Sequence, residues 1–114
     1  MRERSTLELL DDIHEAIRKI IDYTADRDCE SFTNDSMCTD AVLRNFEVIG
    51  EAAKKIPVNM RNSHPEIPWE RMIGLRNIVS HEYFGIDFSI IWQIIESSLS
   101  DLPSLISEMQ KSID

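Results

Sequence analysis

Apolar residues recur every three or four positions along most of this 114-residue chain, and only three glycines interrupt the pattern. That spacing is typical of amphipathic α-helices, because residues three and four apart share one helical face. It is not the period-two alternation of half-buried strands. The sequence therefore predicts an all-α fold, a bundle of four or five helices in a single domain over residues 1–114.

Two helices are expected in the first half of the chain. The first begins at Ser5, which forms an S-x-x-E capping box with Glu8. Its expected core stripe is Leu7, Leu10, Ile13, Ile17, Ile20, Ile21 and Thr24. A polar connection follows, and the second helix begins within residues 35–37 and ends at Pro57. Its expected core face is Cys38, Ala41, Val42, Phe46, Ile49, Ala53 and Ile56.

A segment with three prolines, residues 57–68, separates these helices from the second half of the chain. Proline at these positions excludes a long helix there. Pro68 suits the first turn of a third helix, which runs towards His81. Asp87 is the expected cap of a fourth helix, and Pro103 kinks or restarts that helix.

Charge and composition limit the classes of function. The net charge is −9, from 21 acidic and 12 basic residues, which opposes nonspecific attraction to a phosphate backbone. An activity on nucleic acid must therefore come from a local site. The basic residues that are candidates to hold RNA are Arg44, Lys54, Lys55, Arg61 and Arg71, and a solvated surface charge is the favoured interpretation of each. The amino end does not look like a secretory signal and the apolar runs are too short for a membrane span, so a cytoplasmic protein is expected.

The residue types that bind metals are present but poorly spaced for a site. Cys29 and Cys38 lie nine positions apart without a C-x-x-C pair. His14 and His64 have no cysteine or carboxylate companions at ligand spacing, so both are expected to be structural. We therefore expect neither a metal nor another cofactor.

One string combines three kinds of polar chemistry, R-N-I-V-S-H-E-Y at residues 76–83. The imidazole of His81 can move a proton near neutral pH. Arg76 offers a planar set of donors to a phosphate, and Tyr83 can bond a phosphate or stack on a base. Together these groups suit RNA cleavage without a metal.

Helical geometry does not bring all three groups together on one straight helix. Position 81 is turned by about 140° from Arg76 at about 100° per residue. Convergence requires either a loosened helix end or a second subunit, which favours a two-fold dimer. A purely structural interpretation also remains, in which Arg76 pairs with Glu47 or Glu51 and the other two residues only complete a helix.

The string R-N-I-V-S-H-E-Y, of the form R-x-x-x-x-H-x-Y, resembles the motif of HepT-like toxins within the HEPN superfamily. The likeness extends to R-N-F-E-V-I-G-E-A-A-K-K-I-P, residues 44–57, and to residues 64–87 around the motif. It also includes I-I-W-Q-I-I, residues 90–95, and covers most of the chain.

This resemblance implies an α-helical homodimer and a metal-independent endoribonuclease with Arg76 and His81 as its catalytic residues. Asn77 and Tyr83 are expected to position RNA. The resemblance also implies a toxin of a type VII toxin–antitoxin system, whose antitoxin is an MntA-like minimal nucleotidyltransferase that transfers AMP to Tyr83. A different interpretation is a noncatalytic helical module that docks and regulates such a nucleotidyltransferase.

Overall fold

The computed structural model describes residues 3–82 and 85–113, and for residues 80–82 it describes the backbone alone. Within these residues every regular element of secondary structure is a helix, as predicted. The five longer helices correspond to the predicted bundle, and the fourth predicted helix is interrupted at residues 98–101 and restarts as α7, with Pro103 in the first turn of α7. The helices are α1 (Thr6–Thr24), α2 (Cys29–Thr33), α3 (Ser36–Lys55), α4 (Val58–Asn62), α5 (Trp69–Glu82), α6 (Phe88–Ser97) and α7 (Leu102–Ile113).

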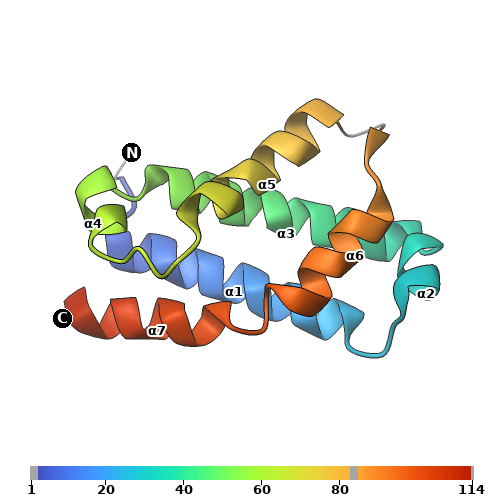
Figure 1. The fold of residues 1–114 in the computed structure, drawn as a ribbon, viewed down its shortest axis with the longest axis horizontal. Helices are drawn as coiled ribbons and strands as arrows, with labels where there is room; N and C mark the ends of the chain where they lie inside the picture. Colours follow the sequence, from blue (N-terminus) through green and yellow to red (C-terminus); the bar gives the residue numbers. More distant parts are fainter. Residues whose placement is uncertain (1–2, 83–84, 114) are drawn as a thin grey trace.

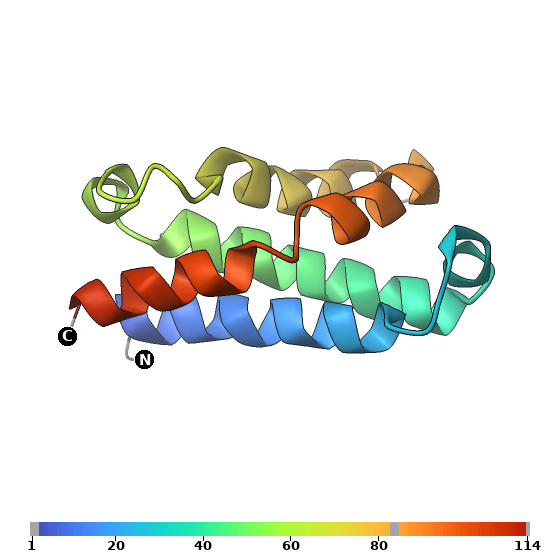
Figure 2. The ribbon, with the colours of Figure 1, turned by 60° about the horizontal axis from the view of Figure 1, so that its bottom comes forward.

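Helix α3 is the centre of the fold, with α1 packed on one side and α5 on the other (Figures 1 and 2). The predicted core face of α3 is buried except for Ala41, which is half-buried. The buried surface is wider than one stripe, since Thr39, Leu43, Asn45, Gly50 and Ala52 are buried as well. An amphipathic helix with one neighbour hides one stripe, whereas a helix between two neighbours must hide two. This central position makes α3 the support on which α5 is placed.

Helix α1 begins as the sequence predicts. The Ser5 hydroxyl accepts from the Glu8 backbone N–H at 3.1 Å, and the Glu8 carboxylate accepts from the Ser5 N–H at 2.9 Å. The predicted core stripe is wrong at Ile21, which is exposed, and at Leu7, which is half-buried. Leu9 and Ala16, which the prediction omitted, are buried instead.

The neighbour of α1 explains the exposure of Ile21. Helix α7 lies antiparallel beside α1, with Ser107 bonded to His14 and Gln110 bonded to Asp11 (Figure 2). With these pairings, α7 starts at Leu102 and runs away from Ile21, so it does not extend to the level of Ile21. That side of the last turn of α1 is therefore left uncovered.

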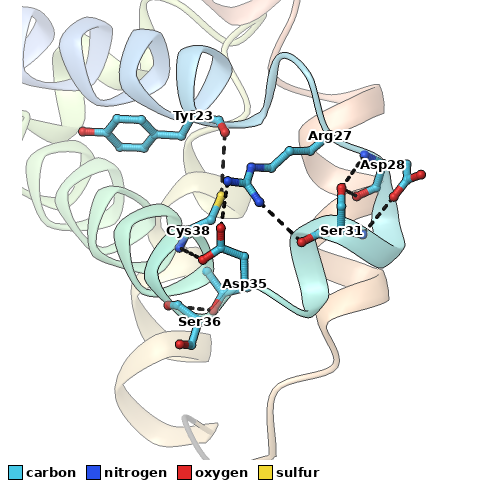
Figure 3. A network of polar contacts seen from close by, with 8 residues as sticks. Tyr23, Arg27, Asp28, Ser31, Asp35, Ser36 and Cys38 are labelled. Carbon is cyan, nitrogen blue, oxygen red and sulfur yellow. Dashed lines mark hydrogen bonds and ion pairs between the residues drawn. The ribbon is translucent and has the colours of Figure 1, made fainter.

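The polar connection between α1 and α3 contains a short helix that the sequence did not predict, and a network of polar contacts fixes it (Figure 3). Asp28 and Ser31 form a second capping box at the start of α2. The Arg27 guanidinium pairs with Asp35 at 2.8 Å, and Asp35 accepts from the Cys38 backbone N–H at 3.1 Å. Asp35 is thus the N-cap of α3, which begins at Ser36, within the predicted residues 35–37.

Phe32 of α2 fixes the position of α6. Its ring is fully buried and contacts Phe88 edge-on, with ring centroids 6.2 Å apart, and Trp92 at 5.3 Å. Asp87 caps α6, as predicted, by accepting from the Ser89 N–H at 2.9 Å. The proline-rich segment contains one short helix, α4, of five residues, in agreement with the prediction that no long helix forms there.

None of the helices in residues 3–82 and 85–113 combines the length and the apolar content that crossing a bilayer requires.

Candidate functional site

Arg76 lies on α5 where α5 comes closest to α3. Gly50 faces it on α3, and a Cβ atom added to Gly50 would stand 2.6 Å from the Arg76 Cβ and 2.9 Å from its backbone nitrogen. The carbonyl oxygen of Met72 would be 3.0 Å away. Real Cβ atoms do not come so near to backbone atoms, so only a glycine permits this approach of the two helices. The backbone of Arg76 is therefore held against α3 at a fixed depth.

The Arg76 side chain is held by the residue that follows Gly50. Its Nε–H donates to the Glu51 carboxylate oxygen Oε1 in an ion pair between α5 and α3. The purely structural interpretation of the motif predicted that Arg76 pairs with Glu47 or Glu51. This ion pair is present, and Glu51 is the partner. Glu47 instead pairs with Arg44 at 3.4 Å.

This ion pair orients the arginine more than it stabilises the fold. The two side chains are 32% and 41% exposed, and partly exposed pairs contribute about 0–1 kcal/mol to stability. A guanidinium has five N–H donors in a planar fork, and the pair engages the one on Nε. Gly50 and Glu51 together therefore form a seat, which we call the arginine seat, that fixes both the backbone and the side-chain direction of Arg76.

The other motif residues are described to different extents. Asn77 follows Arg76 on α5 and is exposed. The backbone of residue 81 is part of α5, which remains helical through Glu82. The side chain of His81 and all of Tyr83 lie outside the described residues. Their convergence with Arg76 therefore stays a prediction.

A mostly apolar groove of about 510 Å³ runs along α5 beside the motif. Gly74 and Ile78 line it from α5, and Ile94 lines it from α6. A Cβ added to Gly74 would meet no atom within 4 Å, so this side of α5 is open where the Gly50 side is closed. Helix α5 therefore has one face pressed against α3 and another face that borders open space.

The remaining histidines have local partners. The His14 Nε2 lies 3.2 Å from the Ser107 hydroxyl, which links α1 to α7. His64 lies 3.2 Å from the Glu66 carboxylate and 3.3 Å from the Ser112 hydroxyl. Contacts of this kind are what the structural interpretation of both histidines predicts.

The cysteines and acidic residues form no ligand cluster in the described part of the chain. No group of three or more histidine, cysteine, aspartate or glutamate side chains is placed to hold a metal ion there. Cys29 and Cys38 are free thiols. Cys38 is buried, and this burial raises the pKa of its thiol.

Sequence reasoning named Arg76 but missed the glycine on which its position depends. A lone glycine inside a helical pattern signals that another backbone comes close, yet it does not say which one. Only the packing of α3 against α5 identifies Arg76 as the neighbour of Gly50.

Comparison with known proteins adds an independent line of evidence. A family model described as Ribonuclease HepT-like matches residues 13–109. A Methanocaldococcus jannaschii protein named "Putative RNase MJ1380" is 39% identical over 110 residues, which cover 96% of this chain and 98% of that protein. A Thermococcus cleftensis protein named "Probable ribonuclease HepT" is 39% identical over 109 residues, 96% of each chain. No solved structure gave a significant match.

Proposed function

Because this chain belongs to the ribonuclease HepT-like family and is a ribonuclease, we propose that it cuts RNA internally, without a metal, through Arg76 and His81. The observation that carries the proposal is the arginine seat. A structural arginine needs only a carboxylate partner, whereas this one also has its backbone fixed by a glycine contact that no other residue type permits. Such placement suits a group whose position must hold to a fraction of an ångström.

The proposed chemistry is attack of a ribose 2′-oxygen on the adjacent phosphorus. A base removes the 2′-hydroxyl proton as the O2′–P bond forms, and the P–O5′ bond breaks while the 5′-oxygen takes up a proton. His81 serves as the base or as the acid, because an imidazole titrates near neutral pH. Arg76 donates to the nonbridging phosphate oxygens, whose negative charge grows in the transition state.

A two-fold dimer is part of the proposal. The sequence left two routes to convergence, a loosened helix end or a second subunit. Helix α5 is regular through Glu82, so residue 81 does not lie in a loosened end. The turn of about 140° between positions 76 and 81 therefore persists, which favours a second subunit as the source of the complementary group.

We propose further that the ribonuclease is the toxin of a toxin–antitoxin pair and that Tyr83 is its off switch. A minimal nucleotidyltransferase would transfer AMP to the Tyr83 hydroxyl. The adenylate adds bulk and negative charge within two residues of His81, where the RNA phosphate has to bind. Asn77, exposed next to Arg76, is the proposed contact to the RNA on the same helix.

The alternative, a noncatalytic module that docks a nucleotidyltransferase, has the acidic surface of the chain in its favour. Membership of a ribonuclease family counts against it. The two proposals differ in one measurable respect, since only the ribonuclease has a cleavage activity to lose when His81 is changed.

The test is RNA cleavage in the presence of EDTA by the wild type, by His81→Ala and by His14→Ala as a matched control. We expect cleavage by the wild type and by His14→Ala, because His14 only bonds Ser107. His81→Ala should retain its helicity and lose cleavage. Equal activity of the wild type and His81→Ala would refute the catalytic role, and loss of wild-type cleavage in EDTA would refute metal independence. Preincubation with the nucleotidyltransferase and ATP should silence the wild type but not Tyr83→Phe.

A further inference from the structure

The arginines of this chain divide into two groups. Among the described residues, five arginines lie within 4.0 Å of a carboxylate: Arg4, Arg18, Arg27, Arg44 and Arg76. Arg61 and Arg71 have no such partner in the part of the chain that the structure describes. Carboxylates are abundant in a chain of net charge −9, so two arginines without one are worth explaining.

Both of these arginines line the same pocket. It has a volume of about 520 Å³, lies where α4 leads into α5, and is also bordered by Asn62 and Trp69. Arg61 is half-buried, and its Nε–H donates to the Ile56 carbonyl oxygen at 3.0 Å, which fixes the direction of its guanidinium. The pocket, which we call the Arg61–Arg71 pocket, therefore brings together two guanidinium groups that have no carboxylate within 4.0 Å in the described part of the chain.

We propose that the Arg61–Arg71 pocket binds a backbone phosphate of the RNA substrate, a few nucleotides away from the bond that is cut. This inference rests on the proposed ribonuclease function. Arginine is suited to the role because its planar fork donates to two phosphate oxygens at once. A phosphate is also the group that nucleic acids supply at every nucleotide, so this contact adds affinity without selecting a sequence.

The position of the pocket along α5 supports this assignment. The Cα atoms of residues 71, 74, 78 and 81 follow one stripe of an ideal helix, and residues 71 and 81 are about 15 Å apart along its axis. Arg71 and Pro68 line both the pocket and the apolar groove, so the two hollows adjoin. A single strand of RNA with one phosphate in the pocket can therefore run along α5 towards the motif.

One residue of the pocket has the opposite sign. Glu70 also lines it, and a carboxylate repels a phosphate. The proposal therefore predicts effects of opposite direction from neighbouring positions, because Arg71→Gln removes attraction and Glu70→Gln removes repulsion. A change of fold stability or of overall structure would not produce this opposition.

The experiment measures binding of a long single-stranded RNA to proteins that also carry His81→Ala, so that the RNA stays intact. Arg71→Gln should weaken binding by on the order of tenfold, the effect of losing a charge-assisted hydrogen bond. It should also reduce the slope of log K against log salt by about 0.7, the value for one phosphate of a single strand. Glu70→Gln should strengthen binding.

Two comparisons separate the pocket from general electrostatics and from the cleavage site. Lys19→Gln on α1 removes one positive charge elsewhere, and it should change RNA affinity by less than about twofold. In the active protein, Arg71→Gln should impair cleavage of the long RNA and spare a dinucleotide, which does not reach the pocket. Arg61→Gln should act like Arg71→Gln, with helicity measured because Arg61 also caps α3.

Each unfavourable result has one meaning. Equal losses in Arg71→Gln and Lys19→Gln, or unchanged RNA affinity in Arg71→Gln, would overturn the pocket. A dinucleotide defect in Arg71→Gln would move the residue into the cleavage site and overturn the assignment. Weaker binding of a nucleotidyltransferase partner with unchanged RNA affinity would show that the pocket serves a protein instead. Absence of wild-type cleavage, with RNA binding still dependent on Arg71, would overturn the ribonuclease mechanism and leave the pocket standing.

Discussion

Alanine at position 50 is the sharpest probe of how the fold places Arg76. The new Cβ would lie 2.6 Å from the Arg76 Cβ, where nonbonded carbon atoms prefer about 3.5–4.0 Å. The overlap of about 1 Å involves two backbones, so no rotamer change relieves it and the helices must separate. Overpacking of this kind costs about 1–3 kcal/mol, offset by about 0.5–1 kcal/mol because alanine is the better helix former. We therefore expect Gly50→Ala to destabilise the protein by up to about 2.5 kcal/mol.

The same substitution on α5 provides the matched control. A Cβ at Gly74 would meet no atom within 4 Å, so Gly74→Ala has the helix-propensity gain without the overlap. Its expected effect is stabilisation by about 0.5–1 kcal/mol. The two variants exchange the same residues in the interiors of two long helices, and the predicted signs are opposite because only one glycine faces a neighbouring backbone.

Urea denaturation at one fixed protein concentration measures both changes, since association would make stability depend on concentration. RNA cleavage measures the consequence for function. A displacement of Arg76 by about 1 Å should slow cleavage by Gly50→Ala about 100-fold under folded conditions. If Gly50→Ala is as stable as Gly74→Ala, or if it is destabilised but cleaves at the wild-type rate, the argument for the arginine seat is wrong.

Three other outcomes follow from the same structure. Glu51→Gln should slow RNA cleavage about tenfold, since Arg76 loses the partner that orients it. It should change the free energy of unfolding in urea by less than about 1 kcal/mol, because the ion pair is partly exposed. Unchanged cleavage would exclude Glu51 as a positioning residue. Acid unfolding should depend on Asp35, because the hydrogen bond from the Cys38 backbone lowers the pKa of its carboxyl in the folded protein below the ordinary 3.8. The contribution of Asp35 to stability is therefore present above pH 3.8 and is lost as the pH falls through the folded pKa. Urea titrations at several pH values should show that Asp35→Asn flattens this dependence. A thiol reagent near pH 8 should label Cys29 before Cys38, since burial raises the pKa of the Cys38 thiol; mass spectrometry of the labelled peptides would reveal the opposite order.

The helix boundaries were predictable because they depend on neighbouring residues in the chain. The capping box of Ser5 and Glu8, the start of α3 within residues 35–37 and the cap at Asp87 are confirmed. In each case a side-chain oxygen bonds a backbone N–H two or three residues away, so the sequence alone carries the signal. Pro103 is a further local signal, because it lies in the first turn of α7, where a proline suits the start of a helix.

The burial of Phe32 was not predicted from the sequence. It lies in a polar segment that was predicted to be a connection, yet its ring is fully buried and anchors α6 through Phe88 and Trp92. One aromatic residue among polar neighbours has no periodicity to reveal that it is buried. Its partners lie more than fifty positions away, and only the folded chain brings them together.

In the candidate site too, the local features were predictable and the contacts between helices were not. The helical fold, the starts of the long helices and the string that holds arginine, asparagine, histidine and tyrosine could be predicted from the sequence, because these properties arise from residues close together in the chain. The contacts of Gly50 and Glu51 with Arg76, and the pocket that Arg61 and Arg71 share, became apparent only from the packing of the helices. Contacts between helices depend on the depth and register of packing, and the periodicity of one helix contains no information about the helix that faces it.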